Sequence, residues 1–253
     1  MRIVDLSHPI VADPPDYPDF LRTDVEYADH AVGAAQVEQL FRVPRRLLRD
    51  GEGWAVERLS VGTHNATHVD APYHYNSTAD GEPAQTIDQI PLERFFGPGV
   101  VVDATGREDG DAVTRDQMEA GIAAAGHELK PGDIVLVHTG CDAYYADPDY
   151  IVRGPGVTPE ATEWLVDQGI HTMGIDAWGW DRPLNIEAQE AIERDEPGIF
   201  WASHQIGRAY SHMERLANLG ALPPTGFTVA CFPLRIVGAS AAPSRVVAIL
   251  PDA

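Results

Sequence analysis

One short stretch of this 253-residue chain concentrates side chains that can do chemistry. His64, His68, Asp70 and His74 follow the pattern H-x-x-x-H-x-D-x-x-x-H. Imidazole and carboxylate groups together suit zinc, manganese or iron(II). A lone histidine is usually only a hydrogen-bonded residue, but three histidines and an aspartate at this density favour a metal or acid–base site.

The spacing of these residues restricts the backbone. In a straight strand the Cα atoms of His64 and His68 would lie roughly 13 Å apart, too far to share one ion. In a helix they would share a face, but Asp70 would point elsewhere. We therefore expect a turn directly after His64, followed by extended chain through Pro72. This geometry predicts His64, His68 and Asp70 as metal ligands and leaves His74 free to move protons.

The sequence after this stretch alternates between predicted strands and predicted helices. Strands are expected at 99–103, 134–138 and 171–176, and helices at 114–125 and 158–168. Such alternation is typical of parallel strand pairing in an α/β fold. The elements outside this region are a first strand at 2–10, a strand at 54–61, a helix at 184–194, and C-terminal strands at 227–232, 234–237 and 245–250.

Two tryptophans follow the predicted strand at 171–176. Trp178 and Trp180 stand in the segment Asp176–Asp181, just past the carboxyl end of that strand, where α/β sheets place their sites. We interpret one of them as the wall of a pocket for a flat ligand, with ordinary core packing as the alternative.

Two N-terminal segments are weaker candidates for ligand contact. Tyr17 and Phe20 lie in an irregular proline-containing segment and are either pocket aromatics or surface-loop residues. The sequence has one basic cluster, formed by Arg42, Arg45, Arg46 and Arg49. Three roles are open for it: binding an anionic group of the substrate, contacting a partner subunit, or forming a solvated face.

The histidine-rich stretch resembles the signature H-x-G-T-H-x-D-x-P-x-H of the cyclase, or kynurenine formamidase-like, family. It departs from that signature at Ala66, where the family usually has glycine, and the change removes backbone freedom but no ligand. The resemblance spans nearly the whole chain and implies a single domain over residues 1–253 with the family's swivelling β/β/α fold. The matching positions are His64, Thr67, His68, Asp70, Pro72 and His74.

The resemblance also implies that a histidine and a glutamate complete the metal site from the far side. Glu214 fits, because a Leu-x-Asn-Leu-like segment follows it, but either His204 or His212 could accompany it. We favour His204, which follows an apolar run at 199–202, and expect His212 to be a surface or supporting residue. If Glu214 begins a helix that reaches Leu219, the helix dipole favours its ionised form.

These residues together predict a hydrolase. A divalent ion held by them lowers the pKa of its water to ~7 and polarises a carbonyl group, while His74 and Glu214 serve as catalytic acid and base. By resemblance to kynurenine formamidases and isatin hydrolases, we expect one or two zinc or manganese ions and cleavage of an amide or lactone in a ring-containing or aryl substrate. The alternatives are a metal-dependent cyclase or lyase acting on a polyketide-like substrate, and a non-enzymatic binding protein.

The composition of the chain limits the kinds of partner that it is expected to bind. The formal net charge is −21, which argues against nucleic acid and anionic membranes as partners. No signal peptide is apparent, and no apolar run approaches the ~18 residues of a membrane span, so we expect a cytoplasmic protein. Two cysteines provide no disulfide framework. The remaining expected partners are a small-molecule substrate and, by resemblance, further copies of the chain in a homodimer or higher homo-oligomer.

Overall fold

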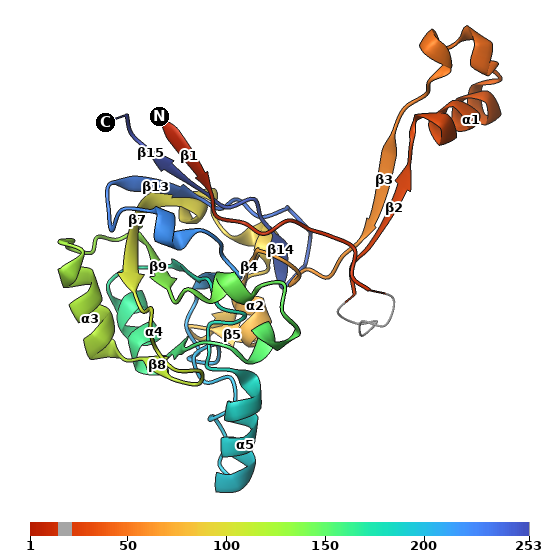
Figure 1. The fold of residues 1–253 in the computed structure, drawn as a ribbon. Helices are drawn as coiled ribbons and strands as arrows, with labels where there is room; N and C mark the ends of the chain where they lie inside the picture. The colour runs from red at the N-terminus through yellow and green to blue at the C-terminus, as the bar shows by residue number, and fades with distance from the viewer. Residues whose placement is uncertain (15–21, 253) are drawn as a thin grey trace. The chain divides into compact units, whose positions relative to one another are not determined.

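The computed structural model describes residues 1–14 and 22–252 and separates into two compact units (Figure 1). The larger unit joins Met1–Pro9 to the chain from Ala66 onward, and the smaller unit is Ile10–Asn65. Each unit has its own secondary structure and is described separately below.

A nine-stranded mixed sheet organises the larger unit (Figure 1). Strands β7, β9 and β11 pair in parallel, as the alternation of strands and helices predicts, and β12, which was not predicted, pairs in parallel with β11. The outer strands pair antiparallel. In spatial order the strands are β1 (Arg2–Asp5), β15 (Val247–Leu250), β13 (Phe227–Ala230), β7 (Phe96–Asp103), β9 (Ile134–His138), β11 (Thr172–Ile175), β12 (Ser211–Glu214), β4 (His68–Asp70) and β14 (Ala241–Pro243).

Strand β9 shows why a continuous apolar run becomes a central strand. Val135 and Val137 belong to one hydrophobic core, and Ile134 and Leu136 belong to the other. Because successive side chains point to opposite faces, a strand covered on both sides must be apolar throughout. The sheet therefore lies between two cores.

Helices α3 (Arg115–Ala124) and α4 (Pro159–Asp167) cover one of these cores. Both predicted helices are confirmed, together with the local signals that start them. Thr114 forms a capping box at the start of α3, and the Thr158 hydroxyl accepts a hydrogen bond from a backbone N–H in the first turn of α4. The remaining helices of this unit are α2 (Pro72–Tyr75) and α5 (Leu184–Arg194).

The C-terminal region differs from the prediction. No strand forms at 234–237, where the chain makes tight turns and leaves Val237 84% exposed. The last strand before β15 is instead β14, with Pro243 within it. Proline cannot donate to a ladder hydrogen bond and is tolerated because β14 is an edge strand.

The larger unit also contains short elements that connect its strands. Two small pairs are β5 (Thr78–Ala79) with β6 (Glu82–Pro83), and β8 (Ala112–Val113) with β10 (Gly156–Val157). Single 3₁₀ turns occupy Ile87–Gln89, Leu92–Phe95, Cys141–Tyr144, Pro148–Val152 and Leu219–Ala221. Over the described ranges, none of the helices is long and apolar enough to cross a membrane.

The smaller unit is built on a two-stranded antiparallel ribbon of β2 (Asp24–Ala28) and β3 (Val56–Ser60). Between these strands the chain forms helix α1 (His30–Phe41), capped by Asp29, and two 3₁₀ turns at Arg45–Leu47 and Arg49–Gly51. Gly53 crosses α1 so closely that a Cβ atom there would lie 2.2 Å from the Ala34 nitrogen. Only a residue without a side chain fits at that crossing.

Candidate metal centre

The site is built from two antiparallel neighbours, β4 and β12. Their register places His212 opposite Asp70 and Glu214 opposite His68. Because side chains alternate along a strand, these four residues project from the same face of the sheet. His68, Asp70 and His212 are fully buried and Glu214 is 5% exposed, so the strands gather two carboxylates and two imidazoles in the interior.

The donor atoms of this cluster are spaced as ligands of shared ions would be. His212 Nε2 lies 3.2 Å from Asp70 Oδ2 and 3.1 Å from Glu214 Oε1. His68 Nε2 lies 3.2 Å from Asp70 Oδ1 and 3.6 Å from Glu214 Oε2. Two ligands bound tetrahedrally at ~2.1 Å from one ion are about 3.4 Å apart. The nitrogen and oxygen donors therefore fit a divalent transition metal in both chemistry and spacing.

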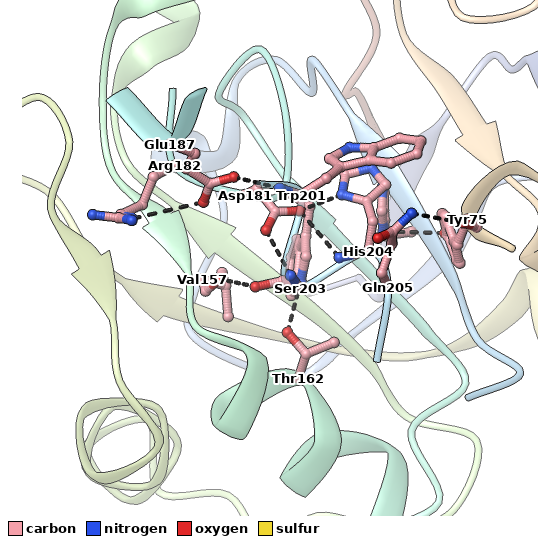
Figure 2. Close-up of polar contacts among 12 residues, drawn as sticks. Tyr75, Val157, Thr162, Asp181, Arg182, Glu187, Trp201, Ser203, His204 and Gln205 are labelled. Carbon is pink, nitrogen blue, oxygen red and sulfur yellow. Dashed lines mark hydrogen bonds and ion pairs between the residues drawn. The ribbon is translucent and has the colours of Figure 1, made fainter. Parts of the chain in front are cut away.

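His204 joins the cluster from a turn that follows α5. Its Nε2 atom lies 3.5 Å from Glu214 Oε1 and 3.9 Å from Asp70 Oδ2. The prediction that His204 is held in the interior is confirmed, since it is 3% exposed. Trp201 of the preceding apolar run packs on the ring, as expected, but Phe200 of the same run is 44% exposed. A short hydrogen bond to Asp181, which was not expected, also anchors the ring (Figure 2).

His212 was expected at the surface or in a supporting position, but the structure places it fully buried within the cluster. The expectation rested on the more polar stretch before His212, but that stretch leads into strand β12, so His212 faces the cluster. Its Nδ1 atom lies 3.1 Å from the Tyr75 hydroxyl, and the Trp180 ring stacks on it at 5.7 Å. A signal for this was present, because His212-Met213-Glu214 repeats the polar–apolar–polar alternation of the segment 68–70.

The cluster balances its own charge. Burial raises the pKa of Glu214, but hydrogen bonds from His204 and His212 outweigh it and hold the pKa well below its usual range. Burial lowers the pKa of His204, but Asp181 and Glu214 outweigh that effect and raise it to about 10. The Glu214 carboxylate is therefore ionised and ready to bind a cation, with the His204 imidazolium as a counter-charge when no cation is bound.

His74 lies at the edge of the cluster, on the single turn of α2. Its Nε2 atom is 3.8 Å from Asp70 Oδ2, and a quarter of its side chain is exposed. The chain was expected to remain extended through Pro72, but helix α2 begins there and turns His74 back toward Asp70. The Trp201 ring packs edge-on against His74 at 4.8 Å and stacks on His204 at 4.4 Å. Sequence reasoning had assigned Trp201 only a packing role, as part of the apolar run before His204.

The other predicted site residues do not all meet at this cluster. His64 is half-buried and belongs to the smaller unit, so its assignment as a ligand stays a sequence-based prediction. Tyr17 and Phe20 lie outside the described residues. Trp180 is fully buried, as the packing alternative expects, and its backbone N–H donates to Glu214 Oε1 at 2.9 Å. Trp178 is half-buried beneath the Arg215 guanidinium, 4.6 Å from its ring centroid.

The fold and cluster agree with comparisons to known proteins. The chain belongs to the Cyclase family, whose model matches residues 4–182, which confirms the family expected from the motif. It is 29% identical to the isatin hydrolase of Roseibium aggregatum, over 81% of this chain and 78% of that protein. It is 31% identical to the kynurenine formamidase of Salinibacter ruber, over 77% of this chain and 79% of that protein. The solved structure of isatin hydrolase A from Labrenzia aggregata, bound to benzyl benzoate, aligns with a TM-score of 0.73 at 26% identity and covers 99% of this chain and 94% of its own.

Proposed function

We propose that this protein is a metal-dependent hydrolase that cleaves the amide or lactone bond of an aryl or ring-containing small molecule. The observation that carries the proposal is the buried group of facing imidazole and carboxylate donors on β4 and β12, 3.1–3.6 Å apart. The names of the family relatives, isatin hydrolase and kynurenine formamidase, support the choice of substrate class.

The proposed ligands are those expected from the motif and from the family resemblance, with one addition. His68, Asp70, His204 and Glu214 offer nitrogen and oxygen atoms to a common centre, and His212 adds a further nitrogen. His64 remains in the proposed set on the strength of the motif alone. Asp70 has two carboxylate oxygens directed at different histidines, which suits a bridge between two ions. Zinc or manganese fits this mixture of donors.

The chain's own residues perform the proton transfers. When bound, the ion activates water and polarises the scissile carbonyl. His74 accepts the proton of the attacking water and returns it to the leaving nitrogen or oxygen, since it is the partly exposed imidazole beside the cluster. Trp201, packed against both His74 and His204, excludes bulk water from that side.

The test is turnover of isatin and of a formylated aryl amine by the purified protein. We expect hydrolysis that a chelator abolishes and added Zn²⁺ or Mn²⁺ restores, and that His68→Ala abolishes. His127→Ala is the matched control, because His127 also pairs with a carboxylate, 2.7 Å away in Asp133, outside the cluster. Activity that survives both the chelator and His68→Ala would contradict the proposal, as would no turnover with either ion.

We further propose that the protein forms a homodimer or higher homo-oligomer through the smaller unit. Apolar side chains are exposed on and near α1, including Tyr27 (75%), Leu40 (66%) and Phe41 (64%). Residues 30–51 carry four arginines against two acidic residues, while the chain as a whole has a net charge of −21, so this segment is complementary to a second copy. Light scattering should give the mass of an oligomer, reduced by the double variant Leu40→Ser/Phe41→Ser. A single-chain mass for the unaltered protein would contradict it.

A further inference from the structure

We propose that Asp181 is the positioning residue for His204, fixing the ring orientation and tautomer that present Nε2 to the cation. The inference rests on the proposed metal-dependent function and extends it to a residue outside the ligand set. Asp181 is 5% exposed and lies in the segment that follows β11.

The Asp181 carboxylate holds two consecutive residues of the turn that carries His204 (Figure 2). Its Oδ1 atom accepts the Ser203 N–H at 2.6 Å, and its Oδ2 atom accepts the His204 N–H at 3.1 Å. The same Oδ2 atom also makes the short hydrogen bond to His204 Nδ1. One carboxylate therefore fixes both the backbone of His204 and its ring.

These contacts decide which ring nitrogen faces the cluster. Both oxygens of Asp181 accept backbone N–H groups, so the carboxylate is the acceptor toward the ring and His204 Nδ1 carries the proton. The Nε2 atom then points the other way, toward Glu214 Oε1 at 3.5 Å and Asp70 Oδ2 at 3.9 Å. A carboxylate behind a ligand histidine is the arrangement that selects the metal-binding tautomer and raises ligand basicity.

The turn around His204 is held from other directions too, so Asp181 acts on a rigid target. Trp201 has a left-handed backbone (φ +64°), and its N–H donates to Glu187 Oε2 at 2.8 Å. The Ser203 hydroxyl donates to the Val157 carbonyl at 2.5 Å. Loss of the Asp181 carboxylate would therefore release the ring of His204 before it releases the turn.

Trp180, the residue before Asp181, makes a second contact between this segment and the metal-ligand cluster. The Trp180 N–H donates to Glu214 Oε1 at 2.9 Å, and the Trp180 indole N–H donates to the Thr162 hydroxyl at 2.9 Å. Consecutive residues 180 and 181 thus orient one carboxylate and one imidazole of the same cluster. Their placement just past β11 matches the edge of the sheet where sites form.

The first test measures Zn²⁺ and Mn²⁺ affinity of Asp181→Asn by competition with a chromophoric chelator. An asparagine amide facing Nδ1 would favour the proton on Nε2, so we expect affinity to fall ~10–100-fold. Asp133→Asn is the matched control: Asp133 is also buried, at 4% exposure, and its carboxylate lies 2.7 Å from His127 Nε2 and 2.8 Å from the Lys130 nitrogen. Affinity should be unchanged in that variant.

A double-variant cycle with His204→Ala separates positioning from a general loss of structure. If Asp181 acts through His204, Asp181→Asn has no further effect on metal affinity in the His204→Ala background. Thermal melting of the metal-free proteins checks folding, and Asp181→Ser replaces Asp181→Asn in the cycle if the latter does not melt cooperatively. Affinity within twofold of the unaltered protein, or an equal loss in both backgrounds, would overturn the inference. Failure of the unaltered protein to bind either ion would instead overturn the proposed function on which it rests.

Discussion

At the scale of single residues, His74 differs from the other histidines around the centre in its access to water. A quarter of its side chain is exposed, whereas His68 and His212 are fully buried and His204 is 3% exposed. A buried imidazole can hold an ion, but exchange of protons with solvent needs an imidazole that water can reach. This contrast is the reason for which we propose His74 as the proton-transfer residue.

Substitution of His74 should therefore separate catalysis from metal binding. We expect His74→Gln to retain bound metal and to lose ~10²-fold or more in turnover, the usual contribution of a positioned acid or base. Elemental analysis and steady-state kinetics on the same preparation would measure both effects. His127→Gln serves as the control, and loss of metal from His74→Gln would show that His74 is a ligand instead.

Ala66 is the one position where the motif departs from the family signature, and its backbone explains the family's preference. It adopts a left-handed conformation with φ of +52°, which costs an alanine roughly 1 kcal/mol more than a glycine. The strained turn leads directly into β4, whose His68 Nδ1 bonds the Ala66 carbonyl at 2.9 Å. The departure therefore lowers stability without removing a donor from the site.

We expect Ala66→Gly to raise the free energy of unfolding, despite the greater freedom of glycine in the unfolded chain. The gain should be roughly 0.5 kcal/mol, measured by denaturant unfolding. Ala123→Gly is the control, since Ala123 is exposed within α3 and the same change there should cost about 0.5–1 kcal/mol. Equal losses in the two variants would contradict a strained backbone at Ala66.

The residues that sequence reasoning placed well are those whose neighbours are local. His68 and Asp70 alternate around an apolar valine, so their common face was predictable from the chain itself. The orientation of His212 depends on the pairing of β12 with β4, and the role of Asp181 depends on a turn 22 residues away. The alternation in 212–214 was a signal for the strand but not for its partner, and the Asp181 contact leaves no periodic signal in its own segment.

At the scale of elements, α5 supports the turn of the metal centre through a buried glutamate. Glu187 is 3% exposed, accepts the Trp201 N–H, and lies 3.6 Å from the Arg182 guanidinium. Burial and the nearby Asp181 charge raise the pKa of Glu187 to about 7, although the Trp201 N–H and Arg182 oppose them. The helix thus places a weakly acidic group behind the turn.

This raised pKa predicts a pH dependence of stability. The pKa of Glu187 in the folded protein exceeds its ordinary value of 4.5. The stability that the protonated Glu187 carboxyl contributes is therefore complete below pH 4.5 and is lost as pH rises through about 7. Glu187→Gln has no carboxyl group to ionise at this position, so it does not lose this stability. The difference in free energy of unfolding between Glu187→Gln and the unaltered protein should therefore rise by on the order of 2 kcal/mol from pH 5 to pH 8, in favour of the variant. Urea unfolding at both pH values measures the change.

The control for this experiment is Glu193→Gln, which alters an exposed glutamate on the same helix. Its stability relative to the unaltered protein should not depend on pH over that interval. The same pH dependence in Glu193→Gln and Glu187→Gln would contradict the assignment to the buried residue.

Elements with local start signals were predictable, and elements defined by their partners were not. The capping box at Thr114 and the proline after Thr158 fixed the starts of α3 and α4 from a few neighbouring residues. A helix from Glu214 to Leu219 was considered, but Glu214 ends β12, which pairs with β4 and β11. The small edge strand β14 was missed for the same reason.

At the scale of the whole molecule, an acidic chain keeps part of its negative charge inside. Asp70, Asp181 and Glu214 are buried together around the histidine cluster, and burying carboxylates is costly without counter-charges. Imidazolium groups supply that charge in part, and a divalent cation would supply it more fully. The family match over residues 4–182 places this arrangement in a fold shared with isatin hydrolases.

The metal content of the purified protein tests the central claim most directly. Elemental analysis should find one or two divalent transition-metal ions per chain in the unaltered protein, after exposure to Zn²⁺ or Mn²⁺ and removal of the excess. Asp70→Ala should lose most of that metal, because Asp70 contacts three histidines of the cluster, while Asp133→Ala should retain it. An unaltered protein without metal, or an Asp70→Ala variant with full metal content, would contradict the account.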